Sequence, residues 1–154
     1  MPEYAINLNA TSNTSANTED EFVEIPQPYS KIKRIEVRQG NGTEAGGVDN
    51  NFRVRLLVLS VLSAGAPVAA TEEKLDQNSR ASGLAVVVKN GTTALALGTV
   101  AAVLHQAVRN ARETYVYDRE VKMNTDLVDG GGFAIAIQSP VVSTLFQVYV
   151  IYED

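Results

Sequence analysis

The chain has 154 residues, no cysteine and a single histidine, which excludes disulfides, thiol chemistry, Cys-ligated metals and a two-histidine metal site within one chain. Hydrophobic residues make up 45% and charged residues 20%, a composition typical of one globular domain. The net charge of −5 comes from residues 1–30, which hold five acids and no base and leave a neutral remainder.

Residues 1–30 are predicted to form an extended polar, acidic arm that precedes a single domain over residues 31–154. Residues 9–18 are a low-complexity tract of Asn, Thr, Ser and Ala, and the prolines that follow stiffen the chain. Phosphate groups repel an acidic arm, so we expect no nucleic-acid contact through it. We expect it to contact protein instead, with these interface residues: Glu19, Asp20, Glu21, Pro26 and Pro28.

Neither secretion nor membrane insertion is expected. The first residues lack the basic and apolar regions of a secretion signal. The apolar runs 56–70 and 90–108 are respectively too short and too polar to span a membrane comfortably as helices.

The first basic residues come in a burst, at Lys31, Lys33, Arg34 and Arg38, with Arg53 and Arg55 further on. One interpretation is a solvated strand face. The other is a basic patch that binds an acidic segment such as 19–21, from the same chain or from a neighbour. Such ion pairs would fix the alignment of the two segments more than they would stabilise them.

Several windows alternate between apolar and polar residues, as strands do. Residues 31–39 change parity, which predicts a bulge near Lys33 and Arg34. Residues 52–63 are predicted to start with one wet face and to end buried on both. Asn90 and Gly91 stand between two apolar runs, the usual signal of a hairpin turn.

Two segments favour helix. Residues 97–112 place apolar side chains at helical spacing and are rich in alanine, but their β-branched residues leave a strand open as the alternative. Residues 72–78 are predicted to form a short connecting helix.

The rest of the chain again alternates. Residues 113–123 are predicted to place two tyrosines on one face, and 133–137 to place two alanines where another element packs closely. The last strand, 145–152, is apolar on both faces, so it belongs inside a sheet or against a partner. Its predicted interface residues are Phe146, Val148, Tyr149 and Val150.

The chain offers little chemistry. His105 is predicted to be a partly buried structural residue, and Asp118 and Glu120 to lie on a wet strand face. A weak calcium site near Asp126 and Asp129 stays open, although their spacing does not match a known calcium loop. We therefore expect no enzymatic activity, no catalytic residue, no metal and no cofactor.

Short strands with frequent turns predict a mainly β protein, an antiparallel sandwich or barrel. With the arm 1–30, the strands beginning "KIKRIEVR" and "FRVRLLVLSVLS", and the closing "FQVYVIYED", the chain resembles small jelly-roll virion proteins such as phage capsid-decoration and single-domain coat proteins. The resemblance implies a homo-oligomeric structural protein, made in the host cytoplasm and found in the virion. The alternative is a jelly-roll module that recognises a carbohydrate or a host surface.

Overall fold

The computed structural model describes residues 2–26, 31–40, 51–64, 68–69, 71–78, 87–88, 94–122, 131–141 and 144–153. These residues form strands and turns, with no helix among them. The strands are β1 (Glu3–Ser12), β2 (Glu19–Pro26), β3 (Lys31–Gln39), β4 (Asn51–Val61), β5 (Val68–Ala69), β6 (Glu72–Lys74), β7 (Val87–Val88), β8 (Leu95–Ala96), β9 (Thr99–Asn110), β10 (Tyr115–Tyr117), β11 (Val121–Lys122), β12 (Gly132–Gln138) and β13 (Leu145–Glu153).

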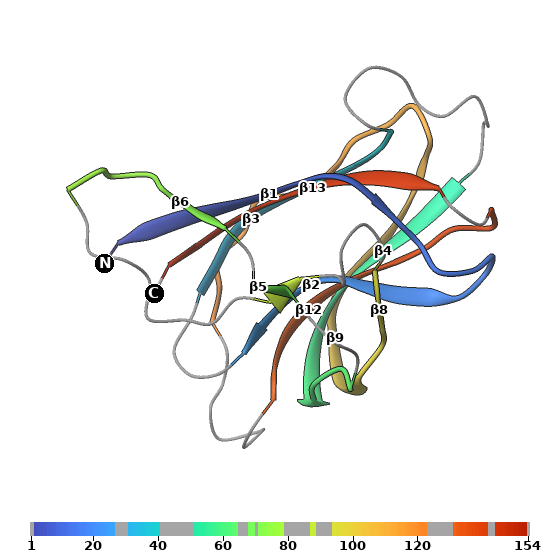
Figure 1. Ribbon diagram of the computed structural model, residues 1–154, viewed down its shortest axis with the longest axis horizontal. Helices are drawn as coiled ribbons and strands as arrows, with labels where there is room; N and C mark the ends of the chain where they lie inside the picture. Colours follow the sequence, from blue (N-terminus) through green and yellow to red (C-terminus); the bar gives the residue numbers. More distant parts are fainter. Residues whose placement is uncertain are drawn as a thin grey trace.

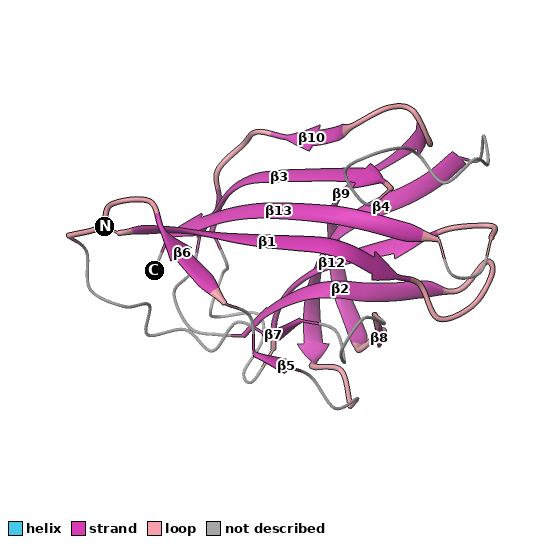
Figure 2. Ribbon diagram, turned by 45° about the horizontal axis from the view of Figure 1, so that its top comes forward, coloured by secondary structure: helices cyan, strands magenta, loops and turns pink. Residues whose placement is uncertain are grey.

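The strands build two antiparallel sheets that lie in two layers (Figure 1). Sheet A has the order β10-β3-β13-β1-β6, with β11 also on β3. Sheet B has the order β5-β7-β2-β12-β4-β9, with β8 also on β2. Figure 2 shows the long strands β3, β13 and β1 side by side in one layer. The predicted mainly β, two-sheet architecture is confirmed.

Eight of the strands form four nested antiparallel pairs. β1 pairs with β13, β2 with β12, β3 with β10, and β4 with β9. Successive pairs in this series lie alternately in sheet A and sheet B. Pairing of β13 with β3 joins the two pairs of sheet A, and pairing of β12 with β4 joins the two pairs of sheet B. Between β4 and β9 the chain forms the short strands β5, β6, β7 and β8. Of these, β6 extends sheet A beyond β1, whereas β5, β7 and β8 extend sheet B beyond β2.

The main core lies between the sheets, because alternate residues of every long strand point inward. Phe146 on β13 is its central aromatic residue and meets Phe22 of β2 and Phe52 of β4 edge to face, at centroid distances of 5.5 and 5.3 Å. Buried members from sheet A are Tyr4, Ile6, Leu8, Ile32, Ile35, Val37, Tyr115, Tyr117, Phe146, Val148, Val150 and Tyr152; those from sheet B are Phe22, Val23, Ile25, Phe52, Val54, Leu56, Val58, Phe133, Ile135 and Ile137.

The predicted extended arm is wrong for most of residues 1–30. Residues 3–12 form β1, between β13 and β6, and residues 19–26 form β2, between β12 and the short strands β7 and β8. The polar tract between them is a turn held by side-chain hydrogen bonds: Asn13 Nδ2 donates to the Val141 carbonyl at 2.9 Å, and Thr14 N donates to Asp20 Oδ2 at 2.7 Å. The polar side chains of this tract therefore make the hydrogen bonds that hold a turn in place.

Neither predicted helix forms. Residues 99–110 are the strand β9, which settles the alternative in favour of strand, and residues 72–74 form β6 followed by a turn. Pairing with β4 and β1 supplies the hydrogen bonds that an isolated helix would have made within itself.

Several strand predictions are confirmed. Ile151 pairs with Arg34 and Tyr152 with Ile32, which leaves Lys33 as the bulged residue in β3. β4 begins with alternating burial and is buried on both faces from Leu56 to Leu59, as predicted, but Val61 at its end is exposed. The last strand lies inside sheet A. The Asn90–Gly91 turn lies outside the described residues; β7 and β8, which flank it, each pair with β2.

Candidate functional site

The predicted acidic interface residues are satisfied within the chain. Glu19 forms ion pairs with Arg53 at 3.2 Å and with Arg55, both from β4. Asp20 is buried and accepts from the backbone and hydroxyl of Thr14. The expected pairing of an acidic segment with basic residues therefore occurs inside one subunit for Glu19. Pro26 ends β2 half-buried, and Pro28 lies outside the described residues.

The basic patch of β3 is also paired within the chain, but with other acids. Lys31 and Lys33 both contact Glu120 and Glu153, with the closest approach, 2.7 Å, between Lys33 Nζ and Glu120. The Lys33 ammonium therefore lowers the pKa of Glu120. Arg34 pairs with Glu36 and Asp118 at 2.7 and 3.0 Å. The carboxylates predicted on a wet strand face are thus the partners of this patch.

The predicted interface on the last strand is mostly core. Phe146, Val148 and Val150 are fully buried between the sheets, so they cannot contact another subunit without unfolding. Tyr149 points to the other side of β13 and is half-buried on the outer face of sheet A. Only Tyr149 of this set lies at a surface.

His105 sits in an aromatic cluster at the open edge of the sandwich. Its Nδ1 lies 2.7 Å from the Tyr115 hydroxyl, and its ring is 4.9 Å from that of Tyr117. Burial, with a further contribution from Tyr117, raises the pKa of Tyr115 to about 12, so this hydroxyl keeps its proton at neutral pH. His105 is half-buried, as predicted, though on a strand and not on a helix.

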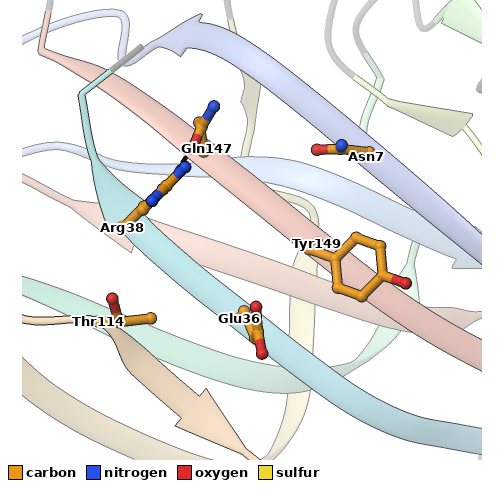
Figure 3. A pocket seen from close by; sticks show the side chains of 6 residues that line it. All are labelled: Asn7, Glu36, Arg38, Thr114, Gln147 and Tyr149. Atoms are coloured by element: carbon orange, nitrogen blue, oxygen red, sulfur yellow. Dashed lines mark hydrogen bonds between the residues drawn. The ribbon is translucent and has the colours of Figure 1, made fainter. Parts of the chain in front are cut away.

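A shallow groove of about 370 Å³ lies on the outer face of sheet A (Figure 3). Its lining residues come from four neighbouring elements: Asn7 on β1, Glu36 and Arg38 on β3, Gln147 and Tyr149 on β13, and Thr114 just before β10. Figure 3 shows the Tyr149 ring lying between Asn7 and Glu36, which belong to different strands. The groove thus combines one aromatic ring with hydrogen-bond donors and hydrogen-bond acceptors.

Two hydrogen-bonded pairs set the electrostatics of this groove. Arg38 Nε donates to Gln147 Oε1, and Arg34 donates to Glu36 through Nε at 3.0 Å and Nη2 at 2.7 Å. Amide, carboxylate and guanidinium groups offer planar donors and acceptors. Arg34 neutralises Glu36, whereas Arg38, which is bonded to an uncharged amide, keeps its positive charge. A hydroxyl-rich ligand is the chemistry that fits such a lining.

A second polar site is buried on the outer face of sheet B. Glu21 and Glu24 of β2 are both buried there beside Ala134 and Ala136 of β12, with which they pair in register. Residues three apart on a regular strand face opposite ways. A bulge at Phe22 removes that difference and brings the two carboxyls to one face.

The segments that flank β4 and β9 close over this carboxyl pair. Gly98 N donates to Glu21 Oε1 at 2.8 Å, and Ser63 N donates to Glu24 Oε2 at 2.9 Å. Gly98 is required by space, because a Cβ there would collide with the carbonyl oxygen of Val61. Leu57, Leu59, Leu62, Leu97, Val100, Ala134 and Ala136 form a small apolar cluster on the same face of the sheet.

The two carboxyls share a proton. The pKa of Glu21 is raised to about 9, mainly by burial and further by the hydrogen bond to Glu24 and by repulsion from Glu24, while the Gly98 N–H opposes the rise. Glu21 Oε2 is fully buried and has no hydrogen-bond partner as an ionised oxygen, which agrees with a protonated Glu21. Protonated Glu21 then donates to Glu24, which completes the hydrogen bonding of the pair.

No catalytic constellation follows from these groups. In the described part of the chain, no cluster of three or more His, Asp or Glu side chains could hold a metal ion. The candidate calcium residues Asp126 and Asp129 lie outside it. Nor does any helix able to cross a membrane occur among the residues that the structure describes.

The sequence predicted neither the groove nor the carboxyl pair. Alternation along β1, β3 and β13 could have placed Asn7, Glu36, Arg38, Gln147 and Tyr149 on outward faces, but not in adjacent strands. Comparison with protein-family models finds no matching family, and comparisons with curated proteins and with solved structures find no similar protein.

Proposed function

We propose that this protein is a structural subunit with a jelly-roll fold that assembles with copies of itself into a viral shell, as a coat or decoration protein. It acts through protein–protein contacts in the virion and has no catalytic role.

The observation that carries the proposal is the strand order. Four nested antiparallel pairs, with the order β10-β3-β13-β1 in one sheet and β9-β4-β12-β2 in the other, support the proposal, because two interlocked Greek keys, as in a jelly roll, would pair strands in this way. Jelly rolls serve as capsid proteins, lectins and cupins. A single histidine cannot supply a cluster of histidine metal ligands, which favours the first two classes over a metal-dependent enzyme.

The acidic N-terminal segment is not part of the proposed contacts. β1 and β2 are internal strands of the two sheets, so assembly has to use exposed faces and edges of the sandwich. The partly buried ion pairs of Glu19 and the paired lysines of β3 stabilise the subunit, so the acids of the same chain already neutralise these basic residues. We therefore assign the protein to a layer of the shell that holds itself together through protein contacts.

Size-exclusion chromatography with light scattering across a hundredfold range of protein concentration, followed by electron microscopy of the large fractions, tests the proposal. A structural subunit should associate as concentration rises and give closed or lattice-like particles. A monomer at every concentration, both alone and when mixed with shells from its virus, would refute it.

A second candidate, a saccharide-binding module, rests on the groove of sheet A. The half-buried ring of Tyr149 offers a platform for the apolar face of a sugar, and the Asn7, Glu36 and Gln147 side chains offer hydrogen bonds to hydroxyls. A glycan array with the wild-type protein and Tyr149→Ala tests it. Binding lost in the variant supports the module, whereas no bound glycan removes this candidate.

A further inference from the structure

Strand β9 is the open edge of sheet B on the side away from β2. It is twelve residues long and pairs with β4 along one side; no described strand pairs with its other side. In an antiparallel ladder every second residue directs its N–H and C=O away from the partner strand. β9 therefore presents a row of backbone donors and acceptors to the outside.

The two edges of sheet A are protected, and β9 is not. The described edge strands β6 and β10 have three residues each; β6 reads Glu-Glu-Lys, and β10 is followed by Asp118, Arg119 and Glu120. Short length and charge are the usual devices that stop one sheet from pairing with another. Residues 99–108 of β9 contain no charged residue and no proline.

Apolar side chains are also exposed along this edge. Val103, Leu104 and Val108 on β9 are 45%, 40% and 56% exposed, and Val61 at the end of β4 is 58% exposed. These four residues, here called the β9 strip, are four of the seven large hydrophobic residues exposed in the described chain. A grouping of this kind marks an interaction surface more often than isolated exposed residues do.

The strand is regular over half its length. Six consecutive pairs join His105–Asn110 to β4, whereas register shifts leave Ala101 and Leu104 unopposed in the other half. Such bulges increase strand twist, and the Leu104 side chain at one of them is 40% exposed. A second strand can thus begin pairing along 105–110 and follow the twist toward Val103.

We infer that the β9 strip is an interface at which β9 of a second copy pairs antiparallel with it, so that sheet B continues from one subunit into the next. An edge of twelve residues is about 40 Å long, and two layers of sheet with their side chains are about 20 Å thick. The edge face is therefore ~800 Å² per subunit, about what a stable protein–protein interface buries on each partner.

Charge favours a copy of the same chain as the occupant. Two molecules of net charge −5 repel each other over most of their surfaces. Antiparallel pairing along β9 brings only Arg109 of each copy to a joint that is otherwise uncharged from residue 99 to residue 108, so the repulsion is smallest here. This choice of partner rests on the proposed function, since self-association is what a shell subunit requires.

The test compares two charge insertions. Val108→Lys puts a charge in the β9 strip, and Leu75→Lys puts the same charge on an exposed leucine just after β6, at the opposite edge of sheet A. Both sites are exposed, so both variants should keep the far-ultraviolet circular dichroism of the wild type. We expect Val108→Lys to raise the dimer dissociation constant at least tenfold in sedimentation equilibrium, and Leu75→Lys to change it less than twofold.

A backbone measurement completes the experiment. Amide hydrogen exchange at residues 105–110 should slow as wild-type concentration rises through the dimerisation range, because outward N–H groups become paired. Shells or oligomers that form equally well with Val108→Lys, and with unchanged exchange, would overturn the interface and leave the proposed function standing. Dimers that Val108→Lys dissolves but that never build larger particles would support the interface and count against the shell.

Discussion

Replacing Glu21 by glutamine tests the shared proton of the buried carboxyl pair. The amide has the same shape as a protonated carboxyl: its oxygen can accept from Gly98 N, and its NH₂ group can donate to Glu24. The variant therefore keeps the hydrogen bonds of the site and removes one ionisation. It separates the effect of the proton from the effect of the contacts.

The size of the effect follows from the pKa. In the unfolded chain Glu21 ionises near its ordinary value of 4.5, whereas burial and Glu24 raise the pKa of the folded state to about 9. Between these values the folded protein holds one proton more than the unfolded chain, so the free energy of unfolding falls as pH rises, by about 1.4 kcal/mol per pH unit. This stabilisation is complete below pH 4.5 and is lost once pH exceeds about 9. From pH 6 to pH 8 the loss is about 3 kcal/mol, a large part of a typical domain stability.

Urea unfolding at half-unit steps from pH 5.5 to 8.5 measures this slope. The wild type should lose stability relative to Glu21→Gln steadily across the range. Glu113→Gln, which removes an exposed carboxylate after β9, is the matched control and should follow the wild-type slope. Parallel curves for the wild type and Glu21→Gln would show that the folded pair holds no extra proton, and the assignment would be wrong.

Three further substitutions test the packing, each by the urea midpoint at pH 7. Phe146→Ala removes the ring that both Phe22 and Phe52 contact and should cost about 3–5 kcal/mol. Ala136→Leu forces a larger side chain under the cover of sheet B, with an expected cost of about 1–3 kcal/mol; a neutral result would mean that this face is open. Asp20→Ala leaves the Thr14 N–H without its acceptor and should cost about 1–3 kcal/mol, whereas an unchanged midpoint would show that the turn does not need this bond.

Sequence patterns predicted correctly those strands in which the alternation of apolar and polar residues matches the alternation of buried and exposed side chains. β4 changes from one buried face to two as its residues predict, and the parity change in β3 locates the bulge at Lys33. β9 is ambiguous in sequence because its bulges at Ala101 and Leu104 interrupt the period of two. The resulting spacing of apolar residues imitates the period of a helix.

The N-terminal segment was predicted wrongly because its composition hides its contacts. The tract that resembles disorder supplies Asn13, whose side chain bonds the Val141 and Thr144 backbones more than 120 residues away in the chain. Long-range partners of this kind leave no local signal. The Glu21–Glu24 pair is hidden for a related reason, since only the bulge at Phe22 places two residues of spacing three on one face of a strand.

Cryo-electron microscopy of the concentrated full-length protein, alone and mixed with shells of its virus, tests self-assembly most directly. The account predicts particles or lattices in which neighbouring subunits share sheet B across β9. Fields of separate monomers under both conditions, with no density added to the shells, would contradict it.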